Sequence, residues 1–179
     1  IVEKSYLTKI KETILFSNDK QYICIHPYNI TTEQSWDIAE YRELIQKCAD
    51  LTNIKIILVG SKDDQLAAQS ITKNKQDNVL NVVGKLTLNE IKAVIQLSDI
   101  VIGPDSDLIR LATALKKTII SIQSSHNQKV VEYAPWKTNH VLITTDQIAQ
   151  QTEEINSEEK HSSEQINHVY SAILFFLKK

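Results

Sequence analysis

Glycine, proline and cysteine are scarce in this 179-residue sequence, which has three, three and two of them, and methionine is absent. Two cysteines give no sign of a disulfide-stabilised secreted fold. Cys24 lies in an apolar run and Cys48 on a helical apolar face, so we interpret both as small buried hydrophobes in a reducing compartment. Because the sequence starts at Ile1 and lacks methionine, we expect it to be a piece of a longer protein.

An excess of charge of one sign and long apolar runs are also lacking. The 20 basic and 22 acidic residues give a formal charge of -2, which offers no reason to expect nucleic acid or an anionic membrane surface as a partner. The apolar run at 172–177 is far shorter than the ~20 residues of a spanning helix, and no signal peptide is visible. With 42% hydrophobic and 23% charged residues, the composition is that of an ordinary globular domain.

Short β-branched apolar runs alternate with amphipathic helical patterns along the chain. Several runs are almost continuously apolar, as expected for parallel strands that are covered on both faces. The alternation predicts an α/β fold with a doubly wound parallel sheet of Rossmann-like type and right-handed crossovers. The expected strands are Tyr22–Ile25, Ile54–Val59, Val79–Val83, Ile100–Ile102, Thr118–Ile122 and Val141–Ile143.

Capping patterns predict where the helices between these strands begin. The predicted start signals are Asp37 with Glu40, Ser61 with Asp64, Thr87 with Glu90, and Asp105 or Ser106. A leading helix over 2–16 and a last helix capped at 162–165 flank them, the last one after a polar connection over 146–161. We therefore expect a leading helix and candidate interdomain linker (1–18), an α/β domain (19–145), and a connection with a C-terminal helix (146–179).

All three glycines, Gly60, Gly84 and Gly103, come just after a predicted strand. Ligands of open parallel sheets bind outside the carboxyl ends of the strands, where glycine permits tight turns and a close backbone approach. The alternative is that these glycines only end strands. His26, which ends the first strand, either contacts the ligand or makes a local hydrogen bond, while Lys62 is either a cationic donor or simply solvated.

The common nucleotide and hydrolase motifs are missing. There is no G-x-G-x-x-G, no G-x-x-x-x-G-K-[ST] and no G-x-S-x-G, which argues against a standard dinucleotide fold, a P-loop NTPase and an α/β-hydrolase. The five histidines show no metal-ligand spacing, so no metal is expected. From the residues alone, the chain is a nucleotide-binding type of α/β domain whose ligand stays open.

Three stretches in this order, 23–45, 54–64 and 81–115, resemble the C-terminal half of the ADP-heptose:lipopolysaccharide heptosyltransferase family (glycosyltransferase family nine, GT-B fold). The resemblance covers about residues 20–125. Its most specific parts are G-K-L-T-L-N-E at 84–90 and D-S-D-L-I-R-L-A-T-A at 105–114.

The resemblance implies that this half binds a nucleoside-diphosphate sugar, with ADP as the candidate nucleotide. A separate N-terminal half would hold the saccharide or lipid-linked acceptor and the catalytic base, so this chain would contain no catalytic residue and would transfer nothing alone. Transfer in the family needs no metal or other cofactor. The implied location is the cytoplasm, including the periphery of the inner membrane.

The resemblance also assigns roles to single residues. Ser106 matches a hydroxyl donor to phosphate, and Asp105 matches an aspartate at the donor end of the site. Asp64 matches the acidic residue that accepts from ribose hydroxyls, although a plain capping role competes. Leu86 matches the position whose backbone reads the base, and Trp36 is interpreted as a packing anchor. The full candidate donor-binding set is Asn29, Gln34, Gly60, Asp64, Gly84, Lys85, Leu86, Asp105, Ser106, Asp107 and Arg110.

Three positions depart from the family pattern: Asp107 replaces a glycine, Arg110 a histidine and Gln34 a lysine. Asp107 would repel a diphosphate, at a cost of about 1 to 4 kcal/mol for charges ~4 Å apart. Alternatively, Asp107 benefits from the helix start and pairs with Arg110, consuming the positive field of the site. Three functions stay open: a transferase donor half, a degenerate interaction or scaffolding module of the same fold, and an unrelated sugar-nucleotide domain such as an epimerase half.

Overall fold

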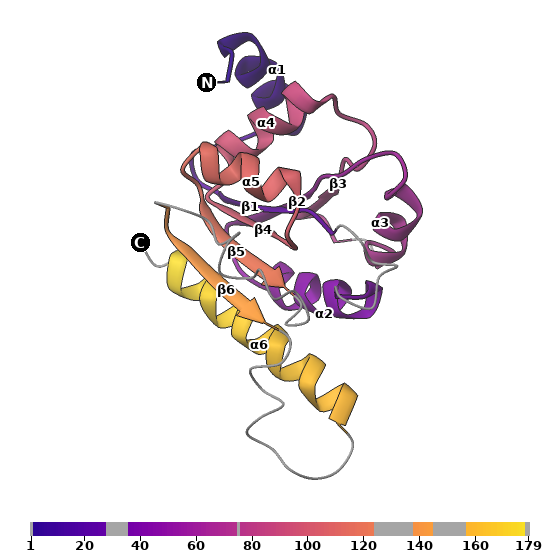
Figure 1. Cartoon of the computed structure of the whole chain (residues 1–179). Helices are drawn as coiled ribbons and strands as arrows, with labels where there is room; N and C mark the ends of the chain where they lie inside the picture. The colour runs from indigo at the N-terminus through magenta and orange to yellow at the C-terminus, as the bar shows by residue number, and fades with distance from the viewer. Residues whose placement is uncertain (1, 28–35, 75, 124–137, 145–156, 178–179) are drawn as a thin grey trace.

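The computed structural model describes residues 2–27, 36–74, 76–123, 138–144 and 157–177. Six parallel strands form one sheet in the order β3-β2-β1-β4-β5-β6 (Figure 1). The predicted α/β fold with a doubly wound parallel sheet is therefore confirmed, and every expected strand forms. The strands are β1 (Gln21–Ile25), β2 (Ile54–Leu58), β3 (Val79–Asn81), β4 (Ile100–Gly103), β5 (Thr118–Gln123) and β6 (His140–Thr144).

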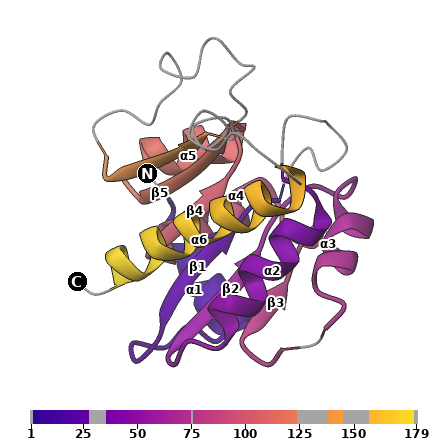
Figure 2. The same cartoon turned by 90° about the horizontal axis from the view of Figure 1, so that it is seen from below.

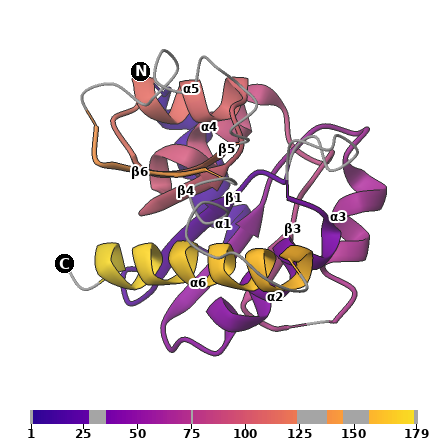
Figure 3. The same ribbon diagram turned by 60° about the horizontal axis from the view of Figure 1, so that its bottom comes forward.

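Helices cover both faces of the sheet, as Figures 2 and 3 show from two further directions. One face carries α1 (Lys4–Ile14), α4 (Leu88–Leu97) and α5 (Asp107–Ala114), and the other carries α2 (Ile38–Ala49), α3 (Gln65–Ile71) and α6 (Ser157–Leu177). Alternate residues of β1 point to opposite cores: Ile23 and Ile25 to the second, Tyr22 and Cys24 to the first. Burial on both faces explains why the strands are apolar almost throughout.

Two helix starts form the predicted reciprocal capping boxes. Asp37 accepts hydrogen bonds from the Ala39 and Glu40 amides while the Glu40 carboxylate accepts from the Asp37 amide. Thr87 and Glu90 do the same at the start of α4. Each box satisfies amides that have no intrahelical partner, so these four-residue patterns fix where the helices begin.

The predicted start of the last helix is wrong. α6 begins at Ser157, five residues before the predicted cap, so the last part of the expected polar connection is helical. The sequence Ser-Glu-Glu at 157–159 favours a helix start, because acidic residues in a first turn interact well with the helix dipole. The earlier part of that connection lies outside the described residues.

α6 packs on the sheet through Ile166, Val169 and Ile173, which are fully buried. Trp36, also buried, donates from its indole N–H to Gln165 Oε1 at 3.0 Å. Trp36 is thus the packing anchor that the sequence predicts, and it ties the entry of α2 to the C-terminal helix.

The leading helix α1 packs Ile10 and Ile14 into the core beside α4. Lys9 Nζ lies 2.6 Å from Glu90 Oε1, and this contact, with the Thr87 capping bonds, holds the pKa of Glu90 well below its usual range, at about 2. The capping carboxylate of α4 therefore also fixes α1. The proposed boundaries of the domain and the linker role of residues 1–18 stay predictions.

No helix in the described part of the chain combines the length and apolar character needed to cross a membrane.

Candidate functional site

A pocket of about 500 Å³ lies at the carboxyl edge of the sheet. Residues that follow β1, β2, β3 and β4 line it together with the first turns of α4 and α5. The strand order reverses between β1 and β4, and open parallel sheets bind ligands at this switch point. The segments that follow four of the strands thus converge on one pocket at the edge where the sequence predicts a ligand.

Most of the predicted site residues line this pocket, and one does not. Lys85 donates from Nζ to the Asn81 carbonyl at 2.9 Å and is not among the lining residues. Asn29 and Gln34 lie outside the described residues. The predicted residues that the fold brings together here are Gly60, Asp64, Gly84, Leu86, Asp105, Ser106, Asp107 and Arg110, with His26 and Lys62 beside them.

Sequence reasoning missed the apolar wall of the pocket, which Leu88, Ile91 and Leu108 form together with Leu86. All three have the helical spacing of core residues, which does not by itself indicate a place in a pocket wall. Leu88 is nevertheless 58% exposed. The available signal was their position within one turn of a helix start at the ligand edge of the sheet.

Two glycines shape the pocket. Gly103 ends β4, and a Cβ added there would lie 2.9 Å from the backbone carbonyl oxygen of His26, so only glycine lets β4 leave the sheet this close to β1. Gly84 has φ +69°, the left-handed region that favours glycine, and its amide donates to the Gly60 carbonyl at 3.0 Å. That bond joins the loops after β2 and β3.

The predicted Ser61–Asp64 capping pair forms only one half of a capping box. Asp64 Oδ2 accepts from the Ser61 amide at 2.9 Å and from the Ser61 hydroxyl at 2.6 Å, but the Asp64 side chain caps no amide of α3. The bond back to the Ser61 amide is of the kind that Glu40 and Glu90 make in the two complete boxes, but here α3 begins only at Gln65 and Asp64 is its N-cap. Asp64 thus closes the turn after β2 while lining the pocket.

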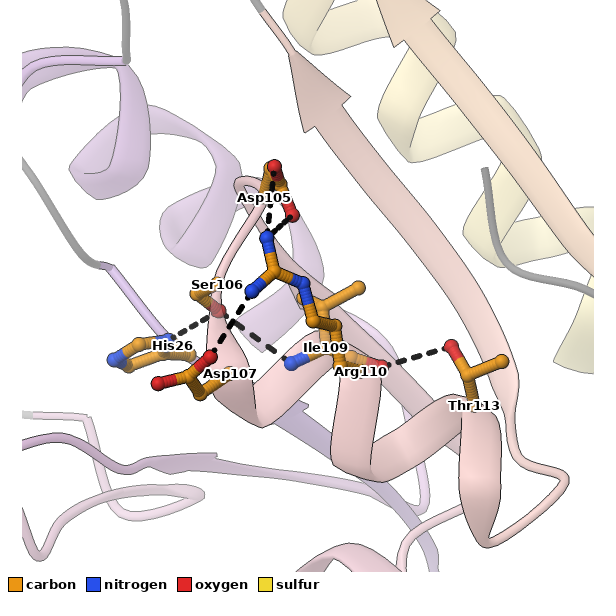
Figure 4. Close-up of polar contacts among 7 residues, drawn as sticks. All are labelled: His26, Asp105, Ser106, Asp107, Ile109, Arg110 and Thr113. Atoms are coloured by element: carbon orange, nitrogen blue, oxygen red, sulfur yellow. Dashed lines mark hydrogen bonds and ion pairs between the residues drawn. The ribbon is translucent and has the colours of Figure 1, made fainter. Parts of the chain in front are cut away.

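Ser106 is the N-cap of α5, which decides between the two predicted capping residues. Its Oγ accepts from the Ile109 amide at 3.4 Å and lies 3.1 Å from His26 Nδ1 (Figure 4). Both side chains are buried. In the described part of the chain, the amides of Asp107 and Leu108 donate to no other group, so the helix start presents backbone N–H groups and the positive end of its dipole to the pocket.

Arg110 forms ion pairs with two carboxylates that also line the pocket. Its guanidinium lies 3.2 Å from Asp105 Oδ1 and 3.2 Å from Asp107 Oδ1 (Figure 4). The predicted Asp107–Arg110 pair is therefore confirmed, and the Asp105 contact is new. The Asp107 side chain is 96% exposed and, within the described residues, accepts from Arg110 only, so it does not cover the free amides of α5.

The lining side chains carry a formal charge of -1, from the carboxylates of Asp64, Asp105 and Asp107 against Lys62 and Arg110. An anion entering this pocket meets both the backbone amides of α5, which attract it, and an arginine that already pairs with two carboxylates. In the described ranges, no group of three or more His, Cys, Asp or Glu side chains lies close enough to hold a metal ion. The expectation of metal-free chemistry stays a prediction.

Burial lowers the pKa of His26 from 6.5 to about 4, against the opposing influence of the Asp64 carboxylate. The imidazole is therefore neutral near neutral pH. A neutral imidazole has one donor and one acceptor nitrogen. The bond to Ser106 consequently joins two groups that can each play either role.

We expect acid to destabilise the fold through His26. The unfolded chain takes up this proton near pH 6.5 and the folded chain only near pH 4, so the contribution is complete above pH 6.5 and is lost as the pH falls towards 4. The full loss is about 3 kcal/mol. Urea unfolding at several pH values measures it, with His26→Asn as the control that lacks this group; equal pH dependence in both proteins would contradict the expectation.

Solved structures share the fold of this chain. A glycosyl transferase family 9 protein from Veillonella parvula matches with a TM-score of 0.84 at 14% identity, over 100% of this chain and 53% of that chain. ADP-heptose LPS heptosyltransferase II of E. coli matches with a TM-score of 0.75 at 16% identity, over 99% and 52%. The sheet and its pocket are thus an α/β domain that matches one half of a GT-B glycosyltransferase.

The family model of glycosyltransferase family 9 (heptosyltransferase) matches residues 4–163, and the chain belongs to this family. The lipopolysaccharide core heptosyltransferase OpsX of Haemophilus influenzae is 28% identical over 110 residues, which are 60% of this chain and 31% of that protein. The chain spans about half the length of the solved relatives and about a third of the curated one. Because the chain belongs to glycosyltransferase family 9, the third function left open by the sequence, an unrelated sugar-nucleotide domain, is excluded.

Proposed function

We propose that this chain is the donor-binding half of a glycosyltransferase that moves a heptose-like sugar from a nucleoside diphosphate, ADP in the first instance, to a saccharide acceptor of lipopolysaccharide. The observation that carries the proposal is the convergence of Ser106, the free amides of α5 and an apolar wall on one pocket at the switch point of the sheet. Family membership and the names of the relatives support the choice of sugar and nucleotide.

In this proposal the diphosphate lies at the start of α5. Backbone N–H groups and the helix dipole favour negative charge at this end, and the Ser106 hydroxyl adds a donor. When the bond from the sugar to the diphosphate breaks, negative charge grows on the leaving phosphate. Donors that are already aimed at that oxygen stabilise the transition state, because they need no reorganisation during the reaction.

The nucleoside would occupy the opposite side of the same pocket. Asp64, which already accepts two hydrogen bonds from Ser61, has a second carboxylate oxygen for a ribose hydroxyl. Leu86 and Leu88 would cover the base with apolar surface, and the Leu86 backbone would read its edge. The acceptor and the catalytic base would belong to a separate half, so we expect residues 1–179 alone to transfer no sugar.

The titration of ADP, UDP and GDP into the chain tests the proposal. We expect millimolar or tighter binding of at least one of them, weakened about tenfold by Ser106→Ala, since a hydrogen bond to a charged group contributes about 1.5 kcal/mol or more. Asp64→Ala weakens binding through the ribose. Ser70→Ala is the matched control, because Ser70 is half-buried and outside the pocket, where its hydroxyl bonds to the Leu66 carbonyl.

A second function rests on the ion pairs of Arg110. With its guanidinium engaged by Asp105 and Asp107, and with Gln34 in place of the family's lysine, this chain has fewer cations available for a diphosphate than the family pattern provides. These features favour a non-catalytic domain that serves as an interaction or scaffolding module. No binding of any nucleoside diphosphate by a folded chain would select this second function.

A further inference from the structure

His26 is buried at the point where the strand order reverses, and its backbone is held there. The residue follows β1, and its amide donates to the Ile102 carbonyl of β4 at 2.9 Å. The missing side chain at Gly103 leaves room for it. The ring is thus fixed against the start of α5 by two strands, and Nδ1 faces Ser106 at 3.1 Å.

The Ser106 hydroxyl has one proton to donate and two lone pairs. One lone pair is used by the Ile109 amide, which caps α5. The contact with His26 then takes either the proton or the second lone pair. If His26 Nδ1 accepts, the serine proton is spent inside the protein, and Ser106 has nothing to donate to an anion in the pocket.

If His26 Nδ1 carries the proton, both lone pairs of Ser106 are occupied by protein donors. The hydroxyl proton then has no acceptor in this pair, and the pocket is the direction left to it. Ser106 becomes a donor only, which is what a phosphoryl oxygen requires. The histidine tautomer therefore decides which donors the helix start offers to an anion. With one tautomer these are the backbone amides and the Ser106 hydroxyl, and with the other they are the backbone amides alone.

We infer that His26 is a positioning residue of the proposed donor site: its Nδ1–H donates to Ser106 Oγ and turns the serine proton towards the diphosphate. The inference rests on the proposed function of the pocket. The geometry supports it, because Nδ1 lies 3.1 Å from Ser106 Oγ, which already accepts from the Ile109 amide, and the buried neutral ring has one donor nitrogen to give. His26 itself acts through Ser106 and contacts no reacting atom.

Variants at position 26 separate positioning from packing. His26→Leu keeps an apolar side chain but no donor, and we expect it to weaken ADP binding about fivefold, the effect of one neutral hydrogen bond. His26→Asn places an amide N–H near the position of Nδ1, so it should bind ADP within about twofold of the original chain. Adenosine, which lacks phosphate, should bind all three alike, and melting curves show whether each variant is folded.

The double variant with Ser106→Ala gives the second readout. If His26 acts through Ser106, removing both side chains should weaken ADP binding no more than Ser106→Ala alone. His140→Leu is the matched control, because His140 is exposed on β6 and lies outside the pocket. Additive losses in the double variant, or equal losses for ADP and adenosine, would show a merely structural role and overturn the inference.

The ring nitrogens report the tautomer directly. In ¹⁵N spectra of histidine-labelled chain, with the His26 signals assigned by their loss in His26→Asn, we expect a protonated Nδ1 with ADP bound. A proton on Nε2 alone overturns the inference even when ADP binds. If the original chain binds no nucleoside diphosphate, the proposed function fails first and the inference falls with it; that titration precedes every variant, so the two failures are distinguishable.

Discussion

Asp107→Asn should strengthen the binding of ADP at least tenfold. The substitution removes one of three carboxylates that line the pocket and keeps the size of the side chain. A like charge about 4 Å from a phosphate costs about 1 kcal/mol in water and about 4 kcal/mol at an effective dielectric of 20. The variant also removes the ion pair between Arg110 and Asp107, so that the guanidinium turns more easily to an anion.

The same substitution should leave stability unchanged or slightly lower. Asp107 is the first residue of α5, where a carboxylate gains about 0.3 to 1 kcal/mol from the helix dipole, and its exposed ion pair with Arg110 adds little. Affinity and stability therefore move in opposite directions. A change that only loosened or tightened the fold would not produce this pair of results.

Calorimetric titration and urea unfolding of the same samples measure both quantities. Asp77→Asn is the matched control: it removes the same charge from an exposed residue that precedes β3, at the amino edge of the sheet. The control should bind ADP as the original chain does. Unchanged or weaker ADP binding by Asp107→Asn would show that Asp107 does not oppose the nucleotide and would remove the electrostatic argument against a working donor site.

The sequence was sufficient where the structural cause is local. The strands follow from apolar runs, and the α2 and α4 starts follow from Asp37 with Glu40 and Thr87 with Glu90, residues three apart. The edge of the sheet that carries the pocket was predicted from the glycines that follow strands. After β3 a glycine is needed for a positive φ, and at the end of β4 one is needed for close approach to the His26 backbone. Each of these features depends on residues close together in the chain.

The features that the sequence did not predict depend on residues far apart or on competing roles. His26 and Ser106 are separated by 80 residues and meet only because β1 and β4 are neighbours. Trp36 and Gln165 are 129 residues apart. Leu88 and Leu108 have the spacing of core residues, and only the sheet topology shows that the first turns of their helices border a pocket. Hydrophobic periodicity cannot separate these two roles.

The early start of α6 and the double pairing of Arg110 are a third kind of case. Ser157 and Ser162 are each followed within two residues by a glutamate, so both are acceptable helix starts, and the local pattern does not choose between them. Arg110 was expected to reach Asp107 one turn away, but the chain turn before α5 also brings Asp105 within 3.2 Å of it. The geometry of that turn is set by Gly103 and by the neighbouring strand.

Gly103→Ala should therefore destabilise the fold by about 2 to 3 kcal/mol, clearly more than Gly60→Ala. The added Cβ would lie 2.9 Å from the His26 carbonyl oxygen, and it would also approach the Ile109 side chain to 3.4 Å. The His26 carbonyl belongs to backbone that is hydrogen-bonded to β4, through the His26 amide and the Ile102 carbonyl. It therefore cannot move aside without straining that bond. Relief requires a shift of the turn between β4 and α5.

The other two glycines provide graded controls in urea unfolding. At Gly60 the nearest atoms are the Asp64 carboxylate at 3.1 Å and a Val83 methyl at 3.3 Å, side-chain ends that can yield, so Gly60→Ala should cost less than about 1 kcal/mol. At Gly84 the Gln65 side chain can move, but φ +69° costs alanine about 1 to 2 kcal/mol. Equal stability of the Gly103→Ala and Gly60→Ala chains would contradict the expected order.

The Gly103 substitution also links the fold to the site. A shift of the turn after β4 carries Ser106 away from His26, since β1 stays in place while the start of α5 moves. ADP binding should then fall at least as far as in Ser106→Ala, even at temperatures where the variant is fully folded. Loss of stability with intact ADP binding would mean that the helix start tolerates displacement, and that its exact contact with His26 does not govern the pocket.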